Sequence, residues 1–282
     1  MAARHPGRAI SRRLLAACSF LLAVIGFGAI NLLWAREYGE PRVILLGAGN
    51  RLSALVTSGH ARVLIATGDD PAAAANALNA ALRPTLPRLD VLIAAGNGAD
   101  LAVPAALAGD PDTRLELAIA PFARPPDWPA LQAMQDVGGP RRLNLPNGVA
   151  VTIESADAAE PSAPEPRWAW RAVVERGASR VVVLSDGDAA GLFSPAGAPN
   201  VLAVSGGEPL EAWREYPAPL LAFGDEALPP GELRDSLRRD DDGPDWTVRV
   251  FPGEAAVFHF IDGGVESDPG TTMRLSGTPA AE

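Results

Sequence analysis

The sequence contains no lysine, one cysteine and only three histidines, and these shortages restrict the chemistry that it can support. A single cysteine, Cys18, cannot form a disulfide within the chain or a thiolate metal site. His5 lies in a basic N-terminal tail, His60 in an expected hairpin turn and His259 in an apolar strand. These three positions are not expected to form a cluster of imidazoles.

Basic residues are also too few for a surface that binds nucleic acid. All 24 basic residues are arginines, and four of them, Arg4, Arg8, Arg12 and Arg13, precede the long apolar run near the N-terminus. The rest of the chain has 20 basic and 34 acidic residues, a net charge of about −14 with histidine neutral. A polyanion such as DNA is repelled by this surface unless a local basic stripe compensates, and no such stripe occurs. Direct nucleic-acid binding is therefore not expected.

Residues 14–34 form an apolar run without a charged residue. At about 1.5 Å per helical residue this run spans roughly 30 Å, which matches the hydrocarbon core of a bilayer. The arginine-rich tail before it predicts a cytoplasmic N-terminus. A cleaved signal peptide is the alternative, but its apolar region is normally only about 7–15 residues long. We expect a single-pass membrane protein with an extracytoplasmic C-terminal domain.

The pattern after the apolar run predicts an α/β domain. Short apolar runs separated by turn residues are typical of neighbouring strands, and capped segments ended by Pro or Gly are typical of helices. Strands are predicted at residues 42–46, 53–58, 61–67, 88–95, 115–119, 148–155, 167–175, 179–185, 199–207, 217–224, 246–251 and 255–261. Helices are predicted at residues 69–84, 99–109, 125–139 and 229–239. So many strands and hairpins favour an αββα sandwich of two mixed β-sheets flanked by helices over a Rossmann fold.

The expected organisation therefore has five parts. They are a cytoplasmic basic tail (1–13), a transmembrane helix (14–34), a linker (35–41), an α/β domain (42–265) and a disordered tail (266–282).

Two Gly-containing segments are candidate ligand loops. "GAGN" at residues 47–50 lacks the third glycine of a dinucleotide fingerprint, and no helix is expected after it, so a turn is favoured. Asp186 and Asp188 in "LSDGD" stand at alternating positions that suit a divalent cation. The loop contains no further ligands, so a solvated turn or a helix cap is favoured.

The order of these elements resembles a known family. The segment "PRVILLGAGNRLSALVTSGHARVLIATGDDP" after an apolar helix is similar to the start of the metallo-β-lactamase-like domain of ComEC-type DNA-uptake proteins. The segments "RWAWRAVVERGASRVVVLSDGDAAG", "PNVLAVSGGEP" and "WTVRVFPGEAAVFHF" resemble later strands of that domain. The resemblance covers about residues 41–265 and implies a metallo-β-lactamase-like fold.

The resemblance also implies where metal ligands would stand. The family's Thr-His-x-His-x-Asp-His motif aligns with residues 95–101, so that Asp100 alone retains a ligand, while Gly96, Gly98 and Leu101 replace histidines. The vestigial metal-site positions implied by the resemblance are Gly96, Gly98, Asp100, Leu101, Asp186, Asp188 and Gly206.

A zinc hydrolase of this kind requires imidazoles and carboxylates that converge on a bound water. The sequence therefore predicts no metal, no cofactor and no catalytic residue. We expect a non-catalytic binding or scaffolding domain, with protein partners in an envelope or DNA-uptake assembly. The alternatives are a ComEC-type metal-dependent hydrolase or nuclease with a divergent site, and an unrelated solute-binding domain.

Overall fold

The chain divides into two compact units, Met1–Glu40 and Pro41–Glu282. The computed structural model describes residues 15, 17–28, 39–82, 88–120, 135–136, 140–157, 168–194, 197–224 and 244–268. The predicted helix at 229–239 and the tail from residue 269 lie outside this part of the chain.

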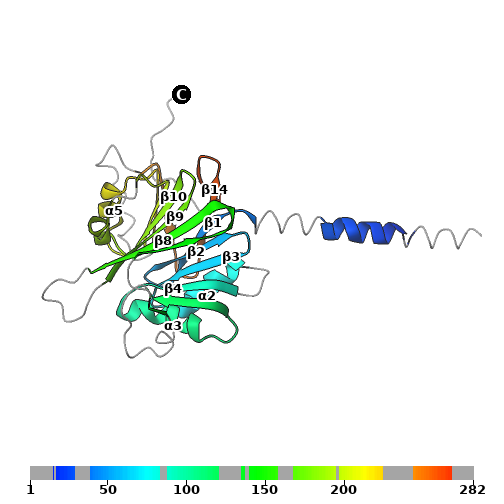
Figure 1. Cartoon of the computed structure of the whole chain (residues 1–282), viewed down its shortest axis with the longest axis horizontal. Helices are drawn as coiled ribbons and strands as arrows, with labels where there is room; N and C mark the ends of the chain where they lie inside the picture. The colour runs from blue at the N-terminus through cyan, green and yellow to red at the C-terminus, as the bar shows by residue number, and fades with distance from the viewer. Residues whose placement is uncertain are drawn as a thin grey trace, which may run out of the picture. The chain divides into compact units, whose positions relative to one another are not determined.

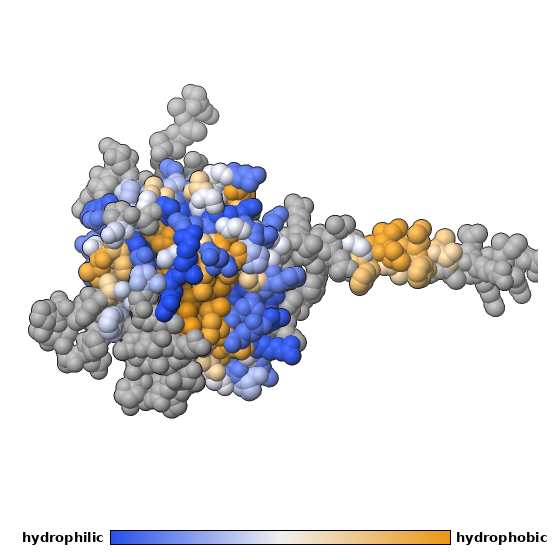
Figure 2. Space-filling view, in the orientation of Figure 1, coloured by the Kyte–Doolittle hydropathy of each residue, from blue (hydrophilic) through white to orange (hydrophobic). Residues whose placement is uncertain are grey.

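The N-terminal unit contains a helical segment whose side chains are almost all exposed. Residues 17–28 are helical, and Phe20, Leu22 and Phe27 are each about 70% exposed. Figure 2 shows this segment as a mostly hydrophobic surface. Within the described residues, no helix has both the length and the apolar character that a membrane crossing requires. The predicted transmembrane segment, residues 14–34, lies only partly within those residues.

Two mixed β-sheets form the second unit. The first sheet has eight strands in the order β15-β14-β1-β2-β3-β4-β5-β6. Their bounds are β1 (Arg42–Gly47), β2 (Leu52–Ser58), β3 (Ala61–Ala66), β4 (Arg88–Ala94), β5 (Arg114–Ala120), β6 (Gln135–Asp136), β14 (Ala255–Ile261) and β15 (Gly264–Ser267). The second sheet has seven strands in the order β13-β12-β11-β10-β9-β8-β7. Their bounds are β7 (Arg141–Asn144), β8 (Val149–Asp157), β9 (Trp168–Arg176), β10 (Ser179–Leu184), β11 (Val201–Val204), β12 (Leu220–Gly224) and β13 (Trp246–Val250).

Both sheets follow the same plan. Strands β1, β2 and β3 are antiparallel, and β4 and β5 then continue in parallel. Strands β8, β9 and β10 are antiparallel in the same way, and β11, β12 and β13 continue in parallel. Because parallel strands end at the same edge of a sheet, the loops after β3 and β4 lie together, as do those after β10, β11 and β12.

The two sheets share one apolar core. A single buried cluster combines Val43, Leu45 and Ile65 of the first sheet with Trp170 and Val183 of the second. Alternate residues of the first sheet pack in a separate cluster with helices α2 (Pro71–Leu82) and α3 (Ala102–Gly109). Helix α5 (Pro209–Glu215) and the 3-10 helix η3 (Asp188–Leu192) cover the outer side of the second sheet. The arrangement in Figure 1 is compatible with a sandwich of two sheets with outer helices.

The α/β class and the two mixed sheets were predicted correctly. The "GAGN" turn is confirmed, because Gly49 has a φ of 81° and the antiparallel strand β2 follows it. The predicted helix at 125–139 is wrong where it can be compared, since Gln135 and Asp136 form strand β6 beside β5. Helix α5 and the edge strand β7 were not predicted. Both are short, and β7 ("RRLN") lacks apolar alternation.

Candidate functional site

The candidate site lies where loops of both sheets meet. It includes the β1–β2 loop, the segment after β4 with the 3-10 helix η1 (Gly98–Leu101), and the segments after β10 and β11. Two side chains connect these loops across the sheets. Ser205, after β11, accepts a hydrogen bond from the Leu52 amide at 2.9 Å and donates to the Leu52 carbonyl at 3.2 Å. Asn97, after β4, bonds both the amide and the carbonyl of Trp168 at 2.8 Å.

An ion pair between Arg51 and Asp100 lies at the centre of this end. The Nε atom of Arg51 donates to Oδ2 of Asp100 at 3.0 Å. The side chains are 26% and 13% exposed, so the pair is largely shielded from water. Charge-assisted bonds of this kind are stronger than neutral ones. Asp100, the residue of segment 95–101 at which the resemblance implies a metal ligand, therefore already has a cationic partner from the protein.

Gly206 makes room for the Arg51 guanidinium. A Cβ atom added at Gly206 would lie 1.6 Å from Nη1 and 2.8 Å from Cζ of Arg51. Gly206 is buried, and its φ is not positive, so it is the approach of Arg51 and not the backbone conformation that excludes a side chain. Position 206 is where the resemblance implies a metal-binding histidine. Arg51 in this conformation and any side chain at 206 exclude each other.

Gly96 is closed to a side chain for a different reason. Its φ of 131° lies in the region that favours glycine, and a Cβ there would lie 2.8 Å from Cβ of Asp100 and 2.9 Å from Oγ1 of Thr67. Position 96, where the resemblance implies a histidine, is thus occupied by backbone that packs tightly against Asp100.

The remaining predicted positions are Asp186, Asp188, Gly98 and Leu101. Asp186 lies near the Arg51–Asp100 pair, because a Cβ added at Gly207, the neighbour of Gly206, would lie 3.2 Å from the Cβ of Asp186. Its Oδ1 accepts a hydrogen bond from the Ala189 amide at 2.9 Å in the first turn of η3, in agreement with the predicted turn or helix cap. Asp188 is exposed at the start of η3.

Gly98 and Leu101 do not contribute to the centre. Gly98 is exposed, with open space on its Cβ side. Leu101 is 2% exposed and packs in the outer core of the first sheet with α2 and α3.

Other carboxylates near this end also have structural partners. Asp69 accepts a hydrogen bond from the Asn50 amide at 3.1 Å, and Asp70 accepts from the Ala72 and Ala73 amides in the first turn of α2. The second interaction caps the predicted helix at its N-terminal end. Across the described ranges, no group of three or more His, Cys, Asp or Glu side chains is placed to hold a metal ion.

The sequence analysis did not identify Arg51. Arg51 directly follows the "GAGN" turn, and no local motif distinguishes it. Its role depends on contact with Asp100, which is 49 residues away.

No protein-family model matches the chain, and no curated protein matches it.

The fit between Gly206 and Arg51 predicts the effect of adding one methyl group. In Gly206→Ala the new Cβ must displace the guanidinium from Asp100, which we expect to lower the free energy of unfolding by about 1 kcal/mol. Urea denaturation of the purified chain measures this loss. Gly109→Ala is the control, because Gly109 is an exposed residue of α3 with open space around it.

The same substitution in an Arg51→Met background shows whether the loss of stability arises from Arg51. In Arg51→Met there is no guanidinium to displace, so Gly206→Ala should cost much less there than in the parent chain. An equal cost in both backgrounds would show that Gly206 is required for a reason other than Arg51.

Proposed function

We propose that this chain is a membrane-anchored, metallo-β-lactamase-like domain in which the Arg51 guanidinium replaces the metal, and that it acts as a non-catalytic binding or scaffolding protein. The observation that carries the proposal is the position of Arg51 between Asp100 and Gly206, two positions at which the resemblance implies metal ligands.

The arrangement of the loops supports the fold assignment. Segments 96–100 and 186–206 are far apart in the sequence, yet Arg51 contacts Asp100 and occupies the space beside Gly206, and Asp186 lies beside Gly207. Two mixed sheets with a shared core and outer helices are also compatible with it.

The side chains present do not fit the family's metal centre. Such a centre requires several neutral imidazoles and carboxylates with free lone pairs. Three of the histidine positions are glycine and one is leucine, while Asp100 is paired with Arg51 and Asp186 caps η3. No hydrolytic step is therefore derived for this protein.

Charge supports a protein partner over a nucleic acid. A domain with a net charge of about −14 repels the phosphate backbone. We therefore propose protein partners in an envelope or DNA-uptake assembly.

Metal content and activity test the non-catalytic proposal. The purified full chain should contain less than stoichiometric zinc or manganese, and should not hydrolyse bis-(p-nitrophenyl) phosphate or DNA when either ion is added. Elemental analysis and product assays measure both. Stoichiometric metal together with turnover that Asp100→Asn abolishes would instead establish the alternative, a metal-dependent hydrolase.

The membrane anchor has a separate test. Val24→Arg/Ile25→Arg places two charges in the middle of the apolar segment, where each arginine costs about 2.5–3.5 kcal/mol during insertion. The parent chain and a Val24→Leu/Ile25→Leu control should stay in the membrane pellet after carbonate extraction, whereas the arginine variant should be released. Release of the parent chain would contradict the anchor.

A further inference from the structure

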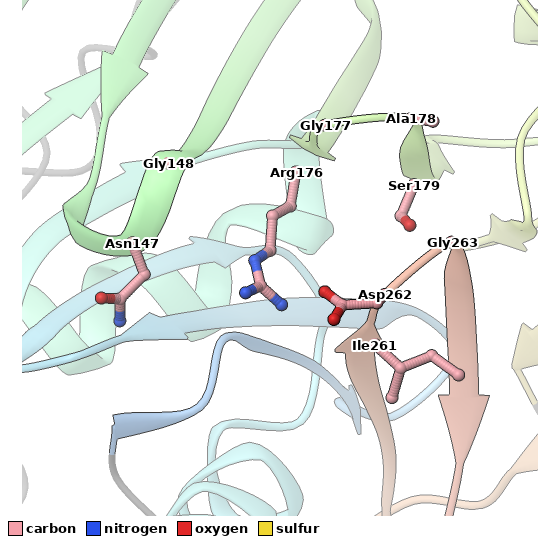
Figure 3. Close-up of a pocket in the computed structure, with 9 residues that line it drawn as sticks. All are labelled: Asn147, Gly148, Arg176, Gly177, Ala178, Ser179, Ile261, Asp262 and Gly263. Atoms are coloured by element: carbon pink, nitrogen blue, oxygen red, sulfur yellow. The ribbon is translucent and has the colours of Figure 1, made fainter.

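A pocket opens at the other end of the two sheets. Strand β9 begins with Trp168, which contacts Asn97 beside the Arg51 site, and ends with Arg176, which lines the pocket. The pocket has a volume of about 360 Å³, within the range of small-molecule sites. Three turns form it: the 3-10 helix η2 (Pro146–Gly148), the β9–β10 turn and the β14–β15 turn (Figure 3).

Arg176 is held in place at this pocket by the other sheet. Its Nη1 atom donates a hydrogen bond of 2.7 Å to the carbonyl oxygen of Phe260 in β14. Because a guanidinium has five N–H donors in a fixed plane, this single bond orients the group and leaves other donors for a ligand.

Asp262 supplies a negative charge on the opposite wall. It is exposed in the β14–β15 turn, and Figure 3 shows its carboxylate turned toward the Arg176 guanidinium. Both residues belong to the described part of the chain, and they form no ion pair with each other there. Two opposite charges therefore face each other across a gap and are not neutralised by direct contact.

Bare backbone and small polar groups line the space around these charges. Gly148, Gly177 and Gly263 have positive φ angles of 71°, 59° and 86°, and each has open space where a Cβ would stand. Ser179 also lines the pocket. This lining leaves room for a small polar molecule between the two charges.

We propose that this pocket binds a small zwitterion that carries one carboxylate and one ammonium group, such as an amino acid. The carboxylate accepts hydrogen bonds from Arg176, and the ammonium group donates to Asp262. A molecule with both charges pairs with Arg176 and with Asp262, whereas a simple anion or a simple cation pairs with only one of these two side chains. The pocket shares no residue with the Arg51 site, so this inference does not depend on the proposed function.

A graded series of ligands tests the proposal. The full chain in neutral detergent micelles is titrated with glycine, β-alanine, 4-aminobutyrate and 5-aminovalerate, and with propionate and propylamine as singly charged controls. Calorimetry and ligand-observed NMR measure binding. We expect saturable binding of at least one zwitterion, roughly tenfold tighter than either control, because two charge-assisted contacts replace one. The number of methylene groups between the two charges of the tightest-binding ligand reports the distance between the Arg176 and Asp262 side chains.

Matched variants assign the contacts. Asp262→Asn should lower the affinity for the best zwitterion to about that for propionate and should not weaken propionate binding, because it removes a negative charge that repels the propionate carboxylate. Asp112→Asn, which removes an exposed carboxylate in a turn outside the pocket, should have no effect. The proposal is overturned if no zwitterion binds saturably, if propionate binds as tightly as the best zwitterion, or if the two variants behave alike.

Discussion

The ion pair between Arg51 and Asp100 determines how this end of the molecule is built. A carboxylate that is only 13% exposed requires a partner, since an isolated buried charge is costly. Arg51 supplies that partner from the β1–β2 loop, and its guanidinium takes the space beside Gly206 of the other sheet. The Arg51 side chain thus pairs with the buried carboxylate of Asp100, which follows β4 of the first sheet. It also fills the space beside Gly206, which follows β11 of the second sheet.

The topology explains why these groups meet. Both sheets change from antiparallel to parallel pairing along the chain, so that the loops after β4 and β11 leave their sheets at the same end of the shared core. The hydrogen bonds of Ser205 with Leu52 and of Asn97 with Trp168 fix this meeting of loops. In the proposed function, protein groups take over the bonding of a metal centre. Glycines stand at positions 96 and 206, where the resemblance implies histidines, and the aspartates serve as an ion-pair partner and a cap.

The strands were predictable because they depend on local patterns. Val181, Val183 and their neighbours form a continuous apolar run that indicates a buried strand. The cap at Asp70 and the turn at Gly59, which has a φ of 60°, also depend on adjacent residues. Residues 135–136 were misassigned because their strand pairing comes from β5, which the local sequence does not reveal.

The site was only partly predictable for the same reason. The gathering of Gly96, Asp100 and Gly206 was expected from a resemblance, but the role of Arg51 follows from contacts with residues 49 and 155 positions away. Neither a motif nor periodicity contains that information. Leu101 shows the converse: its motif position implied the site, whereas its apolar side chain packs into the outer core with α2 and α3.

The most direct test of this account is a crystal structure of the chain grown with excess zinc, with anomalous data collected at the zinc edge. The account predicts that the Arg51 guanidinium contacts Asp100 beside Gly206 and that no anomalous peak occurs there. A zinc peak on Asp100, with Arg51 turned away from it, would contradict the claim that the guanidinium has replaced the metal.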